Sequence, residues 1–437
     1  MIASPLLLGL VLMVDPWAKH VEWSGGVAVE LRGGYAPLTP GLPSEPALRL
    51  SIAPSAVMLY QSRVRNRELW VEYTPQAYLR ASAQYYQQSQ VRRPLLFHQL
   101  RARYGGDLSH SLSWQGVLGG SLGESDYSLQ ASQLGSNLSA GADGSDDGTA
   151  DGGSQGTLLD TPVVTTGGAS ASVGLTARPH PLHTLTLGPS VTVRRLLTDL
   201  GSTTPTGLNY EQTSADLSLS HGVAASRVDS VATTATGGYA DFGSQRGAQA
   251  YAAGSLAWLR RLRPWLDSQL TGGAFYTVQV VQPESGNAIP QGLPVIPTID
   301  YLLAGRLLQR SALRISTNVN LGTRAYFDAV QGSVLPLAGG GVRMDFEHPP
   351  DLTVGFSASF YTPPTQPSSA EASNPATGRS SLSIRTPITY RISRSLSMEF
   401  GTIFTGRGPH LSLVDSSGPF PQKEFWVYVS FRAFYST

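Results

Sequence analysis

Arginine side chains recur along this 437-residue chain at a spacing that could let them bind or repel a solute. The chain has 31 Lys+Arg and 30 Asp+Glu, and because Lys19 and Lys423 are the only lysines, guanidinium groups carry most of the positive charge. Guanidinium rows along a wet cavity would attract anions, whereas arginines paired with carboxylates would only stiffen a wall. The candidate lining residues alternate with apolar ones and are Glu30, Arg32, Arg49, Glu72, Arg80, Arg101, Arg103, Arg194, Asp216, Asp267, Arg306, Arg314, Arg324, Arg343, Asp345, Arg385, Arg391, Glu399 and Arg432.

Aromatic side chains occur on the same polar faces. If their rings formed a contiguous row in a cavity, they would offer flat apolar surfaces on which sugars could stack. The alternative is that aromatic residues near strand ends lie at a membrane interface or pack against loops. The residues concerned are Trp70, Tyr78, Tyr251, Trp265, Phe275, Tyr361, Trp426 and Tyr428.

The sequence lacks the constellations that support catalysis or cofactor chemistry. Cysteine is absent, which excludes disulfides, thiolate catalysis and cysteine zinc sites. His110 with Ser111, and His180 with His183, are the nearest hydrolytic candidates, but neither has an acid at a distinctive spacing. The acidic, glycine-rich tract 143–153 could supply oxygen ligands to Ca²⁺, yet it is better explained as a solvated loop. We expect no catalytic residue, no metal and no cofactor.

Long β-strands must position these side chains, because apolar and polar residues alternate over many positions. The last segment is the clearest, with one face formed by Phe425, Val427, Val429, Phe431, Ala433 and Tyr435. This period of two predicts strands of about 10–15 residues, longer than the ~5–6 of soluble sheets and long enough to cross a bilayer when tilted. Prolines 54, 75, 189 and 387 lie inside such segments and predict bulges, since proline cannot donate to a ladder.

Short turns alternate with longer polar loops along the chain. Eight tight turns are expected near 63–67, 105–108, 179–181, 222–224, 261–264, 309–311, 348–351 and 393–395, with nine longer loops between them, of which 123–168 is the longest. This rhythm predicts an all-β fold, a single closed antiparallel barrel of about 18 strands. A string of sandwich domains would show recurrent linkers, and a solenoid would show a fixed repeat; neither pattern occurs.

Composition narrows the class further. Charged residues make up 14% of the chain, well below the ~25% of soluble domains. No run of ~18 apolar residues occurs, which excludes an α-helical membrane protein, and a net charge of +1 gives no field that would attract nucleic acid. Residues 1–20 contain an apolar run from Pro5 to Val14 and predict a signal peptide, or alternatively a buried terminal strand.

These features resemble bacterial outer-membrane β-barrels of the porin type. Such barrels close with a strand of alternating apolar residues and a terminal aromatic residue that the assembly machinery reads. Phe425 to Tyr435 fit this description, and Ser436 and Thr437 depart from it. The resemblance covers residues 21–437 and identifies no particular family. It implies the outer membrane of a Gram-negative bacterium, with the lipid bilayer and the assembly machinery as partners and no nucleic acid.

The expected function follows from the strand number. Barrels of ~16–18 strands leave a water-filled lumen, so the sequence predicts a channel for ions or small polar solutes, with its arginines favouring anions. The alternative is an export conduit for a polysaccharide or another secreted polymer, working with periplasmic secretion partners. A sugar-specific pore, an enzyme and a closed structural barrel are weaker alternatives, and we expect no enzymatic activity.

Overall fold

The chain forms eighteen β-strands. A computed structural model describes residues 21–36, 45–62, 66–82, 94–126, 163–196, 211–243, 247–281, 295–309, 313–328, 333–348, 351–362, 380–408 and 422–436. The strands are β1 (Val21–Ala36), β2 (Glu45–Ser62), β3 (Arg67–Ser82), β4 (Leu95–Ser109), β5 (Leu112–Asp126), β6 (Val163–His180), β7 (His183–Leu196), β8 (Glu211–Ala224), β9 (Asp229–Asp241), β10 (Ala248–Arg263), β11 (Leu266–Val281), β12 (Val295–Gln309), β13 (Arg314–Asp328), β14 (Ser333–His348), β15 (Leu352–Thr362), β16 (Ser380–Arg391), β17 (Leu396–Gly408) and β18 (Gln422–Ser436). The predicted signal peptide and the acidic tract 143–153 lie outside the described residues.

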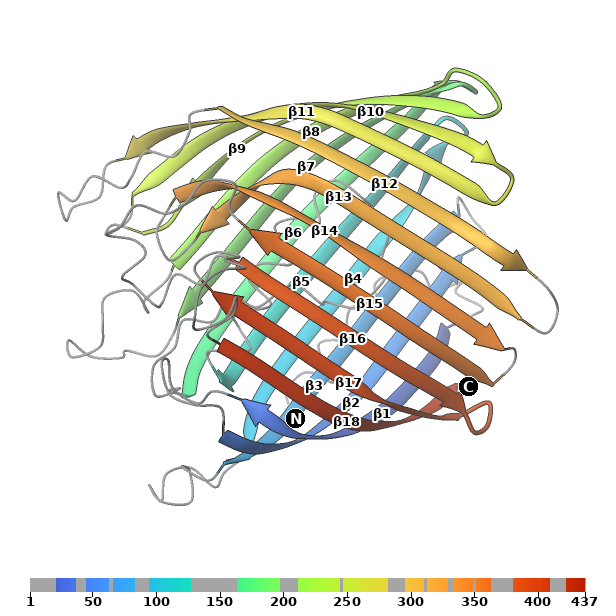
Figure 1. Ribbon diagram of the computed structural model, residues 1–437. Coiled ribbons are helices and arrows are strands. Elements are labelled where there is room, and N and C mark those ends of the chain that lie inside the picture. The colour runs from blue at the N-terminus through green and yellow to red at the C-terminus, as the bar shows by residue number, and fades with distance from the viewer. Residues whose placement is uncertain are drawn as a thin grey trace, which may run out of the picture.

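The strands close into one antiparallel barrel (Figure 1). Each strand pairs with the next along the chain, and β18 pairs with β1. At the closure, Val27 is in register with Ala433 and Leu31 with Val429. The predicted strand number and the predicted closure of the last strand on the first are both confirmed. Closure leaves no strand edge. An edge in lipid would leave backbone N–H and C=O groups unpaired, and each such group is unfavourable by several kcal/mol.

The two faces of the barrel wall differ in chemistry. On one face large apolar side chains remain exposed, such as Leu321 at 58% and Phe431 at 45%. A belt of exposed apolar side chains around a closed barrel is the surface that lipid covers. Residues between them point to the opposite side, because successive side chains of a strand alternate, and these residues face the lumen. No helix within the described ranges is long and apolar enough to cross a membrane.

Several predicted boundaries are wrong. The turn expected at 105–108 lies inside β4, and the chain instead turns at His110 and Ser111; the turn expected at 222–224 lies at the end of β8. The turn at 105–108 was predicted from its glycines, because glycine is common in turns. Glycine also occurs within sheets where two backbones approach closely. A Cβ on Gly105 would lie only 2.7 Å from the carbonyl oxygen of Trp114. The loop expected at 123–168 is also shorter, since β5 extends to Asp126 and β6 begins at Val163.

The strand prolines do not produce the expected bulges. The β1–β2 register runs unshifted through Pro54, and the β7–β8 register runs unshifted through Pro189. Each of two prolines lacks a paired residue on one neighbouring strand. Pro189 has no partner on β6, and Pro387 has no partner on β15. Proline removes one donor without inserting a residue, so the ladder has a local gap while the register is kept.

Candidate functional site

The predicted lining residues lie at strand positions opposite the exposed apolar side chains. Each alternates with exposed apolar residues of its own strand. For Arg80 only the backbone position is described, not the side chain. The residues are not spread evenly: Arg385, Glu399 and Arg432 meet in one network. Trp265 is an exception to the prediction, because it lies exposed in the turn between β10 and β11.

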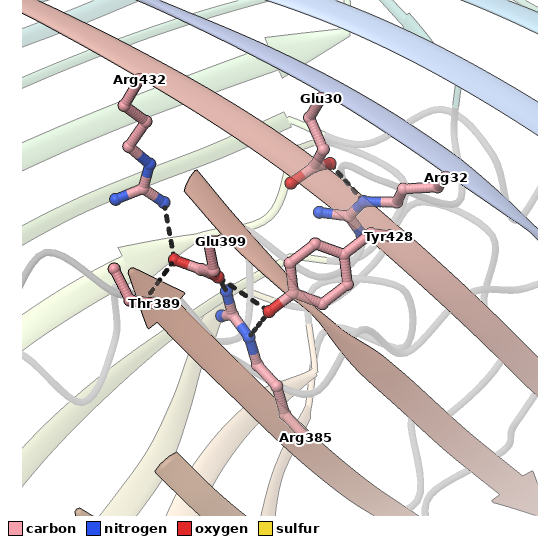
Figure 2. A network of polar contacts seen from close by, with 7 residues as sticks. All are labelled: Glu30, Arg32, Arg385, Thr389, Glu399, Tyr428 and Arg432. Carbon is pink, nitrogen blue, oxygen red and sulfur yellow. Dashed lines mark hydrogen bonds and ion pairs between the residues drawn. The ribbon is translucent and has the colours of Figure 1, made fainter. Parts of the chain in front are cut away.

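Glu399 of β17 is the centre of this network (Figure 2). Its Oε1 accepts hydrogen bonds from Arg385 Nη2 at 3.1 Å and from the Tyr428 hydroxyl at 2.7 Å. Its Oε2 accepts from Thr389 Oγ1 and pairs with Arg432 Nη2, both at 3.5 Å. The residue is only 8% exposed. A carboxylate at this depth is stable because it is both paired with cations and hydrogen-bonded.

Tyr428 of β18 connects the network to β1. The guanidinium groups of Arg385 and Arg32 lie against its ring, with Cζ 5.6 and 5.8 Å from the ring centroid, and Arg32 also pairs with Glu30. Gly401 is the cross-strand neighbour on β17, where a Cβ would lie 3.0 Å from the Tyr428 hydroxyl. Tyr428 as a whole is 1% exposed. Tyr428 therefore orders arginines and presents no open ring face to a sugar.

A row of arginines continues from the network across three neighbouring strands. Arg32 of β1 is in register with Arg49 of β2, and Arg49 is in register with Arg80 of β3. The register therefore gathers arginine positions of three neighbouring strands at one place on the wall. The Arg49 Cζ lies 5.0 Å from the ring centroid of Tyr78, a second buried aromatic residue that supports a guanidinium group. Sequence reasoning found these residues but not their alignment.

Other lumen arginines have carboxylate partners nearby. Arg103 Nη2 lies 3.2 Å from Glu68 Oε1, and Arg343 Nε lies 2.9 Å from Asp345 Oδ2. For these pairs the expectation that arginines and acids stiffen the wall is consistent with the geometry. Both pairs are partly exposed, which limits the contribution of each to stability to about 0–1 kcal/mol.

Arg101 of β4 differs from these residues. It is exposed, and it makes no ion pair with any residue in the described part of the chain. Its backbone is in register with Glu72 of β3, on the same side of the wall as Arg103. Arg101 is thus an exposed cation on this side of the wall, next to Glu72 but without an ion pair among the described residues.

Strands β6 to β9 line another part of the lumen, mainly with hydroxyl groups. The Thr176 and Thr186 hydroxyls lie 3.5 Å apart, and Ser190 donates to Asp216 Oδ2 at 3.0 Å. Predicted lining residues Arg194 and Asp216 are on these strands, but most of their lumen neighbours are Ser and Thr. The lumen is therefore rich in charge from β16 through β18 and β1 to β4, and poor in charge from β6 to β9.

Three histidines lie close together near the turn between β6 and β7, on other strands than the network around Glu399. His183 Nδ1 lies 3.1 Å from His221 Nε2, and the His180 ring meets that of His183 edge-on. Within the described ranges neither these residues nor His110 contacts a carboxylate, and no group of three metal-ligating side chains could hold an ion. This arrangement offers no acid for a hydrolytic site.

A closed antiparallel barrel of eighteen strands with an apolar outer belt has the architecture of outer-membrane β-barrels. Solved structures to which the chain is similar include OccK9 (OpdG) of Pseudomonas aeruginosa. It is 10% identical, and the match covers 96% of this chain and 100% of that one at a TM-score of 0.49. OccAB4 of Acinetobacter baumannii is 9% identical, and the match covers 97% of this chain and 100% of OccAB4 at a TM-score of 0.47. The siderophore receptor PirA of the same organism is 9% identical, and the match covers 94% of this chain and 80% of PirA at a TM-score of 0.42. No family model and no curated protein matches the chain.

Proposed function

We propose that this barrel is an open channel for small polar solutes that prefers anions. The in-register row of Arg32, Arg49 and Arg80 is the observation that supports this proposal. The row gathers arginine positions on one face of the wall, where positive charge would act on a permeating anion. The neighbouring network adds to it, because three arginines and two glutamates leave one net positive charge there.

The net charge of the whole chain is close to zero, but this does not argue against a preference for anions. Net charge averages over the outer face, the turns and the loops, whereas a permeating ion responds to the groups closest to its path. Low-dielectric walls concentrate the field of those groups. Charged side chains that ring a pore set its ion preference in this way.

Arg101→Gln is expected to shift the reversal potential of the reconstituted channel toward cations. Arg101 is exposed in the lumen without an ion pair among the described residues, so its loss removes field without breaking the wall. The shift should be large near 0.1 M salt and small near 1 M, because the Debye length falls from ~10 Å to ~3 Å. Bi-ionic potentials in planar bilayers measure this.

Arg260→Gln is the matched control. Arg260 lies on the outer face of β10, 5.7 Å over the Trp258 ring and 3.8 Å from Asp229, so its loss should leave the reversal potential unchanged. Equal shifts in both variants, or none in Arg101→Gln, would contradict the anion preference. Current through the purified barrel alone would also favour the channel over a polymer-export conduit that needs periplasmic partners.

A further inference from the structure

A pair of histidines joins two neighbouring strands on the outer face of the wall. His183 begins β7 and His221 lies near the end of β8, and the His183 Nδ1 is 3.1 Å from the His221 Nε2. Leu185 and Leu219 are two positions further along the same sides of these strands and are 40% and 45% exposed. Because successive side chains of a strand alternate, both imidazoles belong to the apolar outer side. The pair is therefore separate from the lumen and from the proposed channel function.

The backbone determines how close the two rings lie. His221 stands two positions before the direct partner of His183 in the β7–β8 ladder, so the two residues are diagonal neighbours. Long and aromatic side chains can reach each other at this spacing. The turn before His183 is also tied to the end of β8, because the Ala224 N–H donates to the Leu182 carbonyl oxygen at 2.9 Å. The ladder and the turn thus hold the two Cα positions in place.

The separation of the two nitrogens is that of two ligands on one metal ion. Imidazole nitrogens bind such an ion at about 2.0–2.1 Å, so two of them lie about 2.9–3.4 Å apart between square-planar and tetrahedral bond angles. His183 and His221 already have this separation. One ring donates an N–H to the other, and an ion between the rings takes the place of that hydrogen. Rotation of each ring about its Cβ–Cγ bond then aims both lone pairs at the ion.

The donor atoms decide which ions fit. Neither ring contacts a carboxylate among the described residues, so the oxygen-seeking ions Ca²⁺ and Mg²⁺ do not fit. His180 lies close by, but its Nδ1 accepts the Leu182 N–H at 3.3 Å, and no group of three ligands forms within the described ranges. Two imidazoles with the remaining positions left to water suit Cu²⁺, Ni²⁺ or Zn²⁺, and Cu²⁺ binds such donors most tightly.

We propose that His183 and His221 form a binding site for a divalent transition-metal ion, with Cu²⁺ as the preferred one. The two residues come from different hairpins, because the short turns at this end of the barrel join β6 to β7 and β8 to β9. A bound ion therefore ties together two hairpins that only backbone pairing holds together here. The residues are 38 positions apart in the sequence, which explains why sequence analysis predicted no metal.

Copper binding by the whole barrel tests the site independently of conduction. The barrel, purified without a polyhistidine tag, should bind Cu²⁺ with two nitrogen ligands in its electron paramagnetic resonance spectrum. His221→Gln should weaken binding by at least about tenfold, since even the loss of a group that only supports a ligand costs roughly 10–100-fold in affinity. His348→Gln is the matched control, because it removes an exposed histidine at the end of β14 and should bind Cu²⁺ as the wild type does.

Urea unfolding in lipid vesicles tests whether the ion ties the two hairpins together. An ion that binds only the folded wall stabilises it by mass action. Saturating Cu²⁺ should therefore raise the urea midpoint of the wild type and of His348→Gln, but not that of His183→Gln. The heat-modifiable band on semi-native gels shows that each variant is folded, and either histidine variant can supply both comparisons. Wild-type copper affinity in the variant, or a wild-type rise of its midpoint, would overturn the proposal.

Discussion

Deleting residues 422–437 should abolish barrel assembly. The deletion removes twelve register pairs between β18 and β1 and twelve more between β18 and β17. Two strand edges would then face lipid, and each unpaired backbone group there is unfavourable by several kcal/mol. The expected result is the loss of the heat-modifiable band on semi-native gels and of urea-resistant protein in the membrane fraction.

A shorter deletion separates this effect from the identity of the last residues. Removing only Ser436 and Thr437 takes away a single register pair with β1, at Ser24, and leaves Tyr435 as the terminal aromatic residue. This chain should assemble normally. Normal barrels from the long deletion would contradict the role of β18 in closure.

Glu399→Ala should lower the free energy of unfolding by roughly 3 kcal/mol, because it leaves a poorly exposed guanidinium group without its carboxylate. The Arg385 side chain is 20% exposed and bonds Glu399 at 3.1 Å, and Tyr428 would lose its acceptor as well. Urea titration of the folded barrel in lipid vesicles measures the change. The variant should also prefer anions more strongly, since one negative charge leaves the lumen.

Glu68→Ala is the control for this prediction. Glu68 also pairs with a lumen arginine, Arg103 at 3.2 Å, but the two side chains are 38% and 43% exposed. Its removal should change the free energy of unfolding by less than about 1 kcal/mol. Equal losses in both variants would show that burial does not distinguish the two carboxylates, and the network around Glu399 would then have no special structural role.

The sequence by itself determined the strands, their number and the two faces of the wall. These properties are local, because a period of two over a strand shows which side each residue faces without reference to any other strand. Phe431 and Arg432 could therefore be placed on opposite faces, and closure of β18 on β1 followed from strand count. Local signals failed where glycine and proline have two possible roles, as at Gly105 and Pro189.

The tertiary structure decided which residues meet. The alignment of Arg32 with Arg49, and the contact of Glu399 with Tyr428, depend on the stagger between strands, which no single strand encodes. Val334 of β14 is a further case, because it has the alternation of a lipid-facing residue but packs on Ile296, which alternates with the exposed residues of β12. Alternation gives the direction of a side chain relative to its own strand. Only the path of the strand through space decides whether lipid, water or another strand lies in that direction.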